Sequence, residues 1–365
     1  MSGSASDNAA VVLAERQGPL GLLTLNRPAA LNALSLQMVR DMHAQLRAWA
    51  GDPGVAAVVV RGAGERAFCA GGDIRWLCES YRAGDGQYLR FFEDEYALDL
   101  YTAQYPKPYI ALMDGYVMGG GMGISQHAAV RVVTERTRMA MPEVGIGYFP
   151  DVGGSYFLSR LQGRLGWYLG LTGTQIRAAD ALYAGLADVC LPAAKLPALL
   201  DGLTARDWAT IGNAPGAARE AVAALVADLH PAPAEPPPLA ELRPAIDRIF
   251  ALPTVQAMLD ALGREADPAF SDWAADTQAL MRKRSPIAMG VTNELLARGA
   301  GRSLAECLEM EYALDAQWFQ RGDMLEGVRA AIVDKDQNPR WQPATVEEVD
   351  GALVASFFAP VDEAA

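Results

Sequence analysis

Two isolated acidic residues stand in a glycine-rich segment near the middle of the chain. Glu143 lies in AMPEVGIG and Asp151 lies in YFPDVGG, and neither stretch contains another charged residue. An acid surrounded by apolar residues is a candidate for a shifted pKa and for general acid or base catalysis. The structural alternatives are a capping or ion-pair role for Glu143 and a turn or N-cap role for Asp151.

Two glycine-rich loops precede these acids. The loop FCAGGD (Phe68 to Asp73) and the run Gly119 to Gly121 each follow a predicted strand and precede a predicted helix. Backbone N–H groups in such turns are free to bind a developing oxyanion, so glycine loops followed by carboxylates suggest acyl chemistry. The alternative for the first loop is an ordinary turn that places Asp73 at a helix N-terminus. A dinucleotide fingerprint is excluded for the second loop, because Ile124 stands where its third glycine is needed.

Other nucleophiles and metal ligands are poorly supported. The chain contains no GxSxG pentapeptide, which argues against an α/β-hydrolase serine. A structural role is the favoured interpretation for each of the histidines, His43, His127 and His230. Cys69 adjoins a donor loop, but a small buried side chain is its default role. No paired CxxC spacing suggests a disulfide framework or a zinc site among the four cysteines, Cys69, Cys78, Cys190 and Cys307.

Composition limits the partners and the location that we expect. The 365-residue chain has a formal net charge of −13, which argues against a general nucleic-acid or anionic-membrane surface. No apolar run reaches the length of a membrane span, and the first ten residues lack a basic region followed by an apolar run. We therefore expect a cytoplasmic protein with no nucleic-acid or membrane partner.

The order of apolar segments predicts an α/β fold with a largely parallel sheet. Ser35 is a plausible N-cap for a helix that ends at Gly51 to Pro53, before the β-branched run Val58 to Val60. A second strand is predicted at Tyr109 to Met113, after a helix at Tyr88 to Tyr101. Strands joined by helical crossovers in this way are typical of parallel sheets.

We divide the chain into three parts. Residues 1–10 are expected to be a disordered tail, residues 11–192 an α/β core and residues 193–365 a mostly helical region. Within the helical region, the proline-rich stretch 230–242 is expected to be an extended connector, since proline cannot continue a helix.

Four segments closely resemble the crotonase, or enoyl-CoA hydratase/isomerase, superfamily in order and spacing. The resemblance implies the ClpP/crotonase fold of repeated ββα units and an acyl-CoA substrate. Within the superfamily, FPDVGG, MEYAL, KRSP and the segment Glu326 to Trp341 look like the 3-hydroxyisobutyryl-CoA hydrolases. The four superfamily segments are Asn26 to Ser35, Ala67 to Ile74, Lys107 to Ser125 and Met141 to Leu161.

The resemblance assigns roles to individual residues. It implies that the N–H groups of Gly72 and Gly120 hold the thioester oxygen. Hydratases of the superfamily use two glutamates, but Gly123 stands at the position of the first one here. Hydration of a double bond is therefore not the expected reaction. Glu143 matches the retained glutamate and would activate water or attack the thioester itself. Asp151 would bind a substrate hydroxyl or place the water.

The resemblance also implies a substrate-binding role for Glu95 in FFEDEY, which would otherwise be read as a solvated helix acid. The expected activity is hydrolysis of a short 3-hydroxyacyl-CoA, and the favoured substrate is 3-hydroxyisobutyryl-CoA of valine catabolism. The resemblance implies no metal and no cofactor, since coenzyme A is part of the substrate. The alternatives are an enoyl-CoA hydratase or isomerase and a non-catalytic acyl-CoA-binding protein. Superfamily members commonly form trimers or hexamers, so a homo-oligomer is compatible with the resemblance, although the C-terminal extension could cover that surface.

Overall fold

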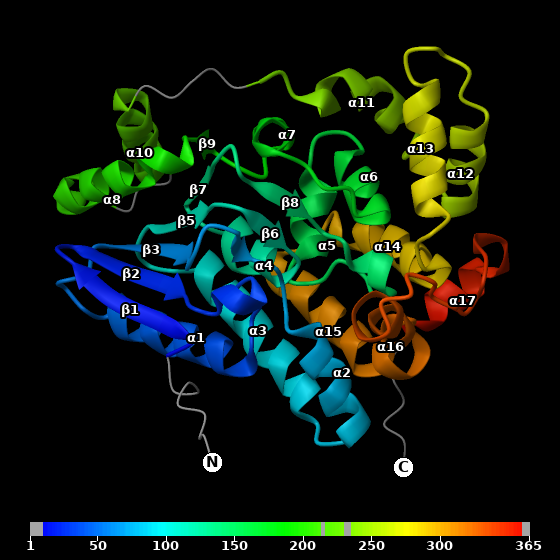
Figure 1. The fold of residues 1–365 in the computed structure, drawn as a ribbon, viewed down its shortest axis with the longest axis horizontal. Coiled ribbons are helices and arrows are strands. Elements are labelled where there is room, and N and C mark those ends of the chain that lie inside the picture. The colour runs from blue at the N-terminus through cyan, green and yellow to red at the C-terminus, as the bar shows by residue number, and fades with distance from the viewer. Residues whose placement is uncertain (1–9, 213–215, 230–234, 360–365) are drawn as a thin grey trace, which may run out of the picture.

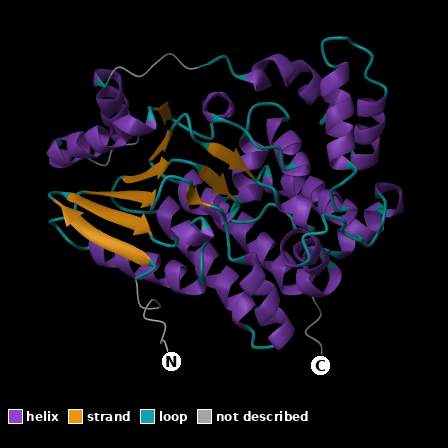
Figure 2. Cartoon of the chain, viewed as in Figure 1, coloured by secondary structure: helices purple, strands orange, loops and turns teal. Residues whose placement is uncertain are grey.

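The computed structural model describes residues 10–212, 216–229 and 235–359 as an α/β core with helices around it (Figures 1 and 2). The tail expected at residues 1–10 lies outside the described residues except for Ala10. Within the described ranges, no helix has the length and apolar character needed to cross a bilayer.

A six-stranded sheet is the larger of two sheets. Its strand order is β1-β2-β3-β5-β7-β9, and only the β1–β2 pair is antiparallel, which confirms the largely parallel sheet. The predicted strand at Tyr109 to Met113 is β5, and the predicted β-branched run lies in β3. The strands are β1 (Val12–Gln17), β2 (Leu20–Leu25), β3 (Ala57–Gly62), β5 (Tyr109–Met113), β7 (Val130–Val133) and β9 (Val189–Cys190).

A parallel three-stranded sheet carries the chain from the large sheet toward the glycine loops. Its order is β4-β6-β8, formed by Ala67–Cys69, Tyr116–Met118 and Arg138–Ala140. Each of these strands follows a strand of the large sheet directly, and a helix or helical turn comes next. This repetition is the ββα unit that was expected.

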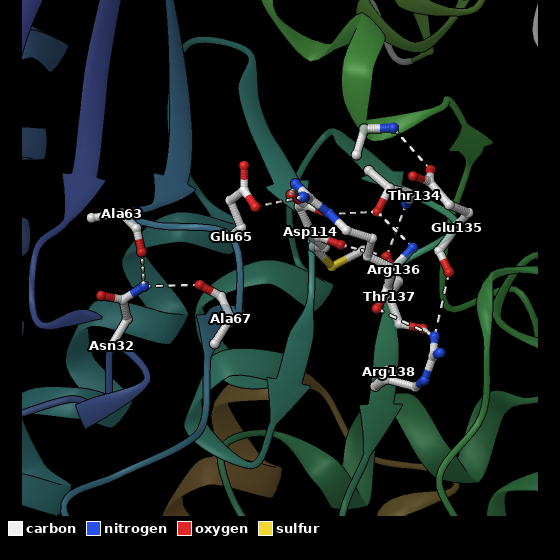
Figure 3. A network of polar contacts seen from close by, with 12 residues as sticks. Asn32, Ala63, Glu65, Ala67, Asp114, Thr134, Glu135, Arg136, Thr137 and Arg138 are labelled. Atoms are coloured by element: carbon white, nitrogen blue, oxygen red, sulfur yellow. Dashed lines mark hydrogen bonds and ion pairs between the residues drawn. The ribbon is translucent and has the colours of Figure 1, made fainter. Parts of the chain in front are cut away.

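Polar side chains tie together the turns that link the two sheets (Figure 3). Asp114, between β5 and β6, accepts hydrogen bonds from Thr134 (2.6 Å) and from Arg136 Nε (2.9 Å), both between β7 and β8. Arg136 also lies 3.5 Å from the Glu65 carboxylate, between β3 and β4. Asn32 donates to the carbonyl oxygens at both ends of that last turn, at residues 63 and 67. These contacts connect the three turns that lead into β4, β6 and β8, the strands that precede the two glycine loops and η2.

The helices surround both sheets. Ser35 caps α1 as predicted, because its side chain accepts from the Met38 N–H at 3.2 Å. The helices of the core are α1 (Leu36–Ala50), α2 (Ile74–Ala83), α3 (Gln87–Ala103), α4 (Gly120–Gln126), α5 (Gly154–Phe157), α6 (Leu165–Thr172) and α7 (Ala178–Ala184), with the 3₁₀ turns η1 (Pro28–Ala30), η2 (Glu143–Ile146) and η3 (Leu158–Arg160).

The described chain after residue 190 forms helices and no strand. Its helices are α8 (Leu196–Ala205), α9 (Trp208–Ile211), α10 (Ala217–Asp228), α11 (Pro238–Ile249), α12 (Val255–Gly263), α13 (Ser271–Met281), α14 (Pro286–Gly299), α15 (Leu304–Arg321), α16 (Met324–Val328) and α17 (Gly351–Ser356), with the short turns η4 (Ala193–Lys195), η5 (Arg329–Val333) and η6 (Val346–Glu348).

The expectation of an extended connector through residue 242 was wrong at its C-terminal end. Helix α11 begins at Pro238, so residues 238–242 are helical. Proline is favoured in the first turn of a helix, where its missing N–H would have no partner in any case. Residues 230–234 of the connector lie outside the described residues.

Two apolar clusters cover the two faces of the large sheet. One face packs against α8, α9 and α10 through residues such as Leu199, Trp208 and Val222. The other packs against α1, α3 and the C-terminal helices in a single cluster that runs from Val12 to Phe357. Helices α3 and α15 contact each other beneath the small sheet (Figure 1). The boundary predicted at residue 192 stays a prediction. The larger apolar cluster contains residues from both sides of that boundary.

Candidate active site

A cavity of about 140 Å³ lies where the two glycine loops, η2 and α3 meet. Its wall contains every residue that the sequence nominated: Gly72, Glu95, Gly120, Glu143 and Asp151. Apolar side chains, among them Leu77, Phe91 and Val152, form much of the remaining surface. A small chamber with apolar walls and a few carboxyl groups suits a short acyl chain that bears one polar substituent.

The two loops present unused backbone donors. The Leu34 N–H donates to Gly71 O (2.8 Å), and Leu34 O accepts from the Asp73 N–H (2.9 Å). Neither hydrogen bond uses the N–H of Gly72, which lies between them. Gly120 is the first residue of α4, where an N–H has no acceptor in its own helix. Neither N–H donates to another group of the described residues. Both are therefore available to a ligand oxygen.

The loops also approach each other closely. Gly71 has a φ of +98°, and a Cβ placed on it would lie 3.2 Å from Met118 O and 3.7 Å from the Gly120 nitrogen. Glycine at 71 therefore permits both the backbone conformation and the near approach. Asp73 closes the first loop, because its carboxylate caps α2 and pairs with Arg27 at 2.9 Å. The structural role considered for Asp73 is confirmed.

Glu143 begins η2, shortly after β8 ends at Ala140, and its side chain faces Gly119. Its side chain is 6% exposed, and its Oε2 atom has no hydrogen-bond partner among the described residues. A Cβ on Gly119 would lie 2.7 Å from Glu143 Oε1, so the carboxyl group sits against the second donor loop. Burial, and then the nearby Asp151, raise the pKa of Glu143 well above its usual value. A raised pKa makes a carboxylate a stronger base once it is ionised.

Asp151 lies on a strained loop between η2 and α5. The following Val152 has a φ of +52°, a conformation that costs a β-branched residue about 1–3 kcal/mol. Glu311 of α15 holds the loop there by accepting from the N–H groups of Gly153 (2.7 Å) and Ser155 (2.9 Å). The C-terminal region thus fixes the backbone that directs Asp151 into the cavity.

Two tyrosine hydroxyls contact the Asp151 carboxyl group. Tyr96 Oη lies 2.9 Å from Asp151 Oδ2, and Tyr148 Oη lies 3.4 Å from the same atom. Burial raises the pKa of Asp151 to about 7, although the hydrogen bonds from Tyr96 and Tyr148 oppose the increase. Asp151 therefore binds a proton more readily than an exposed aspartate does.

Glu95 comes from α3 and lies against the start of α4. A Cβ on Gly120 would collide with Glu95 Oε1, an atom that has no hydrogen-bond partner in the described part of the chain. Burial raises the pKa of Glu95 well above its usual value, with a further contribution from Asp99. The side chain is a wall of the cavity and is not a solvated helix acid.

Position 123 has no room for a side chain. A Cβ on Gly123 would lie 2.7 Å from Asp99 Oδ2 and 2.7 Å from Val152 Cβ. Asp99 is fully buried, and neither of its carboxyl oxygens has a partner among the described residues. Packing therefore closes the position at which a hydratase of the superfamily would carry its first glutamate.

Sequence reasoning missed the groups behind the cavity wall. Tyr96 and Asp99 share α3 with Glu95, and Glu311 and Asp315 share α15. The available signal was the spacing, since acids four residues apart in apolar helical segments share one helix face. Glu311 and Asp315 are both 0% exposed, so that face is buried.

Cys69, His43 and His127, for which the sequence favoured structural roles, are not part of the cavity wall. Burial raises the pKa of Cys69 to about 12, which keeps the thiol protonated. Burial lowers the pKa of His127 to about 4 and also lowers that of His43. His230 lies outside the described residues.

Comparison with known proteins places this chain in a family. The model of the enoyl-CoA hydratase/isomerase family matches residues 20–358. The chain belongs to that family, and its fold of ββα units with a helical C-terminal region is the crotonase fold.

Relatives cover nearly the whole chain. The 3-hydroxyisobutyryl-CoA hydrolase of Gallus gallus, described as mitochondrial, is 39% identical over 98% of this chain and 90% of its own length. The protein of the same name from Danio rerio is 41% identical over 96% of this chain and 90% of its own length.

Solved structures share the complete architecture. A carnitinyl-CoA dehydratase from Mycobacterium thermoresistibile has a TM-score of 0.87 and 42% identity, with 97% of this chain and 98% of that chain covered. An enoyl-CoA hydratase from Rhodobacter sphaeroides has a TM-score of 0.84 and 39% identity, with 96% and 98% covered.

Proposed function

We propose that this protein hydrolyses a short 3-hydroxyacyl-CoA thioester, first of all 3-hydroxyisobutyryl-CoA, to the free hydroxy acid and coenzyme A. The observation that carries the proposal is the set of carboxyl groups around the cavity. Glu143 and Asp151 line it together, whereas Gly123 has neither a carboxylate nor space for one. The relatives named as 3-hydroxyisobutyryl-CoA hydrolases, about 40% identical over nearly the whole chain, support the same substrate.

The reaction begins at the thioester carbonyl. Attack moves negative charge onto the carbonyl oxygen, and the free N–H groups of Gly72 and Gly120 are suited to stabilise it. Loss of one such donor typically costs about 3 kcal/mol in the transition state. The carbon–sulfur bond then breaks, and the coenzyme A thiolate leaves and takes up a proton, which over the whole reaction comes from the water that is consumed.

Glu143 has two chemically balanced routes. As a general base it removes a proton from water while the water oxygen bonds to the carbonyl carbon. As a nucleophile it bonds to that carbon through a carboxylate oxygen, and water then cleaves the resulting anhydride. Repeated turnover in heavy-oxygen water separates the routes, since the anhydride route can place label in Glu143.

Asp151 supplies selectivity in this proposal. An ionised carboxylate in an apolar chamber accepts a hydrogen bond from the substrate 3-hydroxyl, and a substrate without that hydroxyl buries the carboxylate with one hydrogen bond fewer. The methyl group that separates 3-hydroxyisobutyryl-CoA from 3-hydroxypropionyl-CoA is worth about 1–3 kcal/mol in an apolar pocket. Both esters therefore belong in the assay.

The test measures free coenzyme A released from 3-hydroxyisobutyryl-CoA, 3-hydroxypropionyl-CoA, isobutyryl-CoA and crotonyl-CoA. We expect Glu143→Gln to lower kcat about 10²–10⁴-fold, the usual contribution of a positioned acid or base. Glu309→Gln, an exposed glutamate of α15, is the matched control and should retain full activity.

The same panel tests the alternatives. The two solved relatives bear hydratase and dehydratase names, so conversion of crotonyl-CoA without release of coenzyme A would replace the hydrolase proposal by that chemistry. Movement of the double bond would indicate an isomerase. Binding without turnover, unaffected by Glu143→Gln, would indicate an acyl-CoA-binding protein.

The remaining parts of the proposal have their own tests. Activity should survive dialysis against a chelator, since no cofactor beyond the substrate's own coenzyme A is invoked. A cytoplasmic location is also proposed, and cell fractionation tests it against the mitochondrial location named for the relatives. Sedimentation tests the homo-oligomer.

A further inference from the structure

Asp151 is linked to a second buried aspartate by two tyrosines. Tyr96 Oη lies 2.9 Å from Asp151 Oδ2 and 2.7 Å from Asp315 Oδ2. Tyr148 Oη makes a short contact with Asp315 Oδ1 and lies 3.4 Å from Asp151 Oδ2. Asp315 belongs to α15, and it does not line the cavity.

The hydroxyl protons of Tyr96 and Tyr148 are too few to form all the close contacts if both aspartates are ionised. Each close contact between two oxygens requires one hydrogen atom, and a tyrosine hydroxyl supplies only one. Three contacts are close: Tyr96 with each aspartate, and Tyr148 with Asp315. The two phenols supply two protons, so the third must come from a carboxyl group.

The surroundings decide which aspartate holds that proton. Asp315 is 0% exposed and does not border the cavity, whereas Asp151 lines the cavity, where water or a substrate hydroxyl can solvate a charge. A carboxylate is most costly where solvent is excluded, so the third proton belongs on Asp315.

The charged neighbours point the same way. Groups that act electrostatically on the two aspartates or share this part of the site are acids and phenols: Glu95, Tyr96 and Asp99 on α3, Glu143 on η2, Tyr148 after it, and Glu311 on α15. Burial and Asp151 together raise the pKa of Asp315 well above its usual value. Two negative charges in this group would repel each other, and no cationic side chain of the described residues is among the groups that act on the two aspartates.

We infer that Asp315 is a positioning residue of this site. It keeps a proton and donates it in a hydrogen bond to Tyr96, so that the Tyr96 hydroxyl donates in turn to Asp151 and holds that carboxylate ionised beside the cavity. The inference rests on the proposed function, because it assigns Asp151 the task of binding the substrate 3-hydroxyl. No proton is consumed or released, since Asp315 returns to the same state in every turnover.

The experiment compares Asp315→Asn with Asp315→Leu. An asparagine amide reproduces a neutral acid, because its N–H can donate to Tyr96 while its carbonyl accepts from Tyr148. Leucine has similar bulk but removes both interactions. The readout is the ratio of kcat/KM for 3-hydroxyisobutyryl-CoA to that for isobutyryl-CoA, which reports the contact with the 3-hydroxyl and does not change with a general loss of active protein.

We expect Asp315→Asn to keep this ratio within about threefold of the wild type and Asp315→Leu to lower it about tenfold or more, the effect of misplacing a charged hydrogen-bond acceptor. Asp180→Asn is the matched control. Asp180 is 8% exposed on α7, and its carboxylate accepts from Leu239 N–H at 2.9 Å. This control should leave the ratio unchanged.

The pH profile of kcat/KM provides a second readout. If Asp315 stays neutral, Asp315→Asn leaves the acidic limb of the profile within about half a pH unit of the wild type. If Asp315 is the ionised partner, its neutralisation lowers the pKa of Asp151 and moves that limb down by about one unit or more. That shift overturns the inference.

Each remaining outcome is also decisive. A ratio that collapses in Asp315→Asn shows that a charge is needed at 315, and a ratio that survives in Asp315→Leu shows that Asp315 only stabilises the fold. Should Asp315→Leu fail to fold, Tyr96→Phe cuts the same link and must lower the ratio. A wild type that releases no coenzyme A refutes the proposed function itself, before any variant is measured.

Discussion

The closed space at Gly123 can be tested by adding one methyl group. Gly123→Ala places a Cβ 2.7 Å from Val152 Cβ and from Asp99 Oδ2. Carbon atoms pack favourably at about 3.5–4.0 Å, so Val152 or α4 must move by roughly 0.8 Å. Strain of this kind in a packed core costs about 1–3 kcal/mol.

An opposing effect must be subtracted. Gly123 lies inside α4, and replacing glycine by alanine within a helix stabilises a protein by about 0.5–1 kcal/mol. We therefore expect a net loss of about 1 kcal/mol in the free energy of unfolding. Activity should fall further than stability, because Val152 adjoins Asp151 and a displacement of about 1 Å can cost about a hundredfold in rate.

The assay is urea unfolding, with the midpoint compared at constant m-value. Gly351→Ala is the control, since Gly351 begins α17 and a Cβ there meets nothing within 4 Å. It should be neutral or slightly stabilising. Combining Gly123→Ala with Asp99→Ala removes one of the two clashes, so the double variant should be more stable than the sum of the single effects by about 1 kcal/mol.

A Gly123→Ala protein that is as stable as the Gly351→Ala control, with additive effects in the double variant, would refute this reasoning. The space at Gly123 would then be open, and a hydratase glutamate could be installed there. The structure leads us to expect the opposite, namely that Gly123→Glu gives a destabilised protein without crotonyl-CoA hydration.

Three further predictions follow from the buried groups. Stability should fall as the pH rises from about 5 to 8, because the pKa values of Asp151 and Glu311, about 7 and 8, exceed the value of about 4 expected when unfolded. The folded state binds more protons than the unfolded state in that window, so each group lowers the free energy of unfolding by up to about 1.4 kcal/mol per pH unit. A melting temperature that rises over the same range would contradict this prediction. Gly120→Ala should lower kcat/KM about tenfold to a hundredfold by displacing the Glu95 carboxyl group, and adding Glu95→Ala should restore stability measured by urea unfolding but not activity. Cys69 should resist alkylation in the native protein and react after denaturation, which peptide mass spectrometry after brief labelling can measure.

Local features of this protein were predictable from local signals. The strand at Tyr109 to Met113 is a short apolar run, and Ser35 precedes a periodic helical segment, so both could be placed without knowledge of the fold. Pro238 shows the limit of such reasoning. A proline is compatible with an extended chain and with the first turn of a helix, and only packing of the following residues decided for the helix.

The site itself was predictable only in part. The second glycine loop, Glu143 and Asp151 share one segment, and the first glycine loop has the same recognisable chemistry, whereas Glu95 needed the family resemblance to be distinguished from a solvated acid. Asp315 could not be assigned at all. Its contact with Tyr96 spans 219 residues, and such a contact depends on how α15 docks against α3, which no local pattern encodes.

The docking of α15 also sets when the enzyme can become active during its own synthesis. The glycine loops and Glu143 are complete once about two fifths of the chain has been made, but Glu311 and Asp315 come from near its end. Because N-terminal parts of a chain tend to fold first, a nascent core would hold Asp151 on a loop that lacks its Glu311 partner. Thioesterase activity would then appear only after α15 is in place, so a simple activity measurement on ribosome-released fragments would report the last stage of assembly.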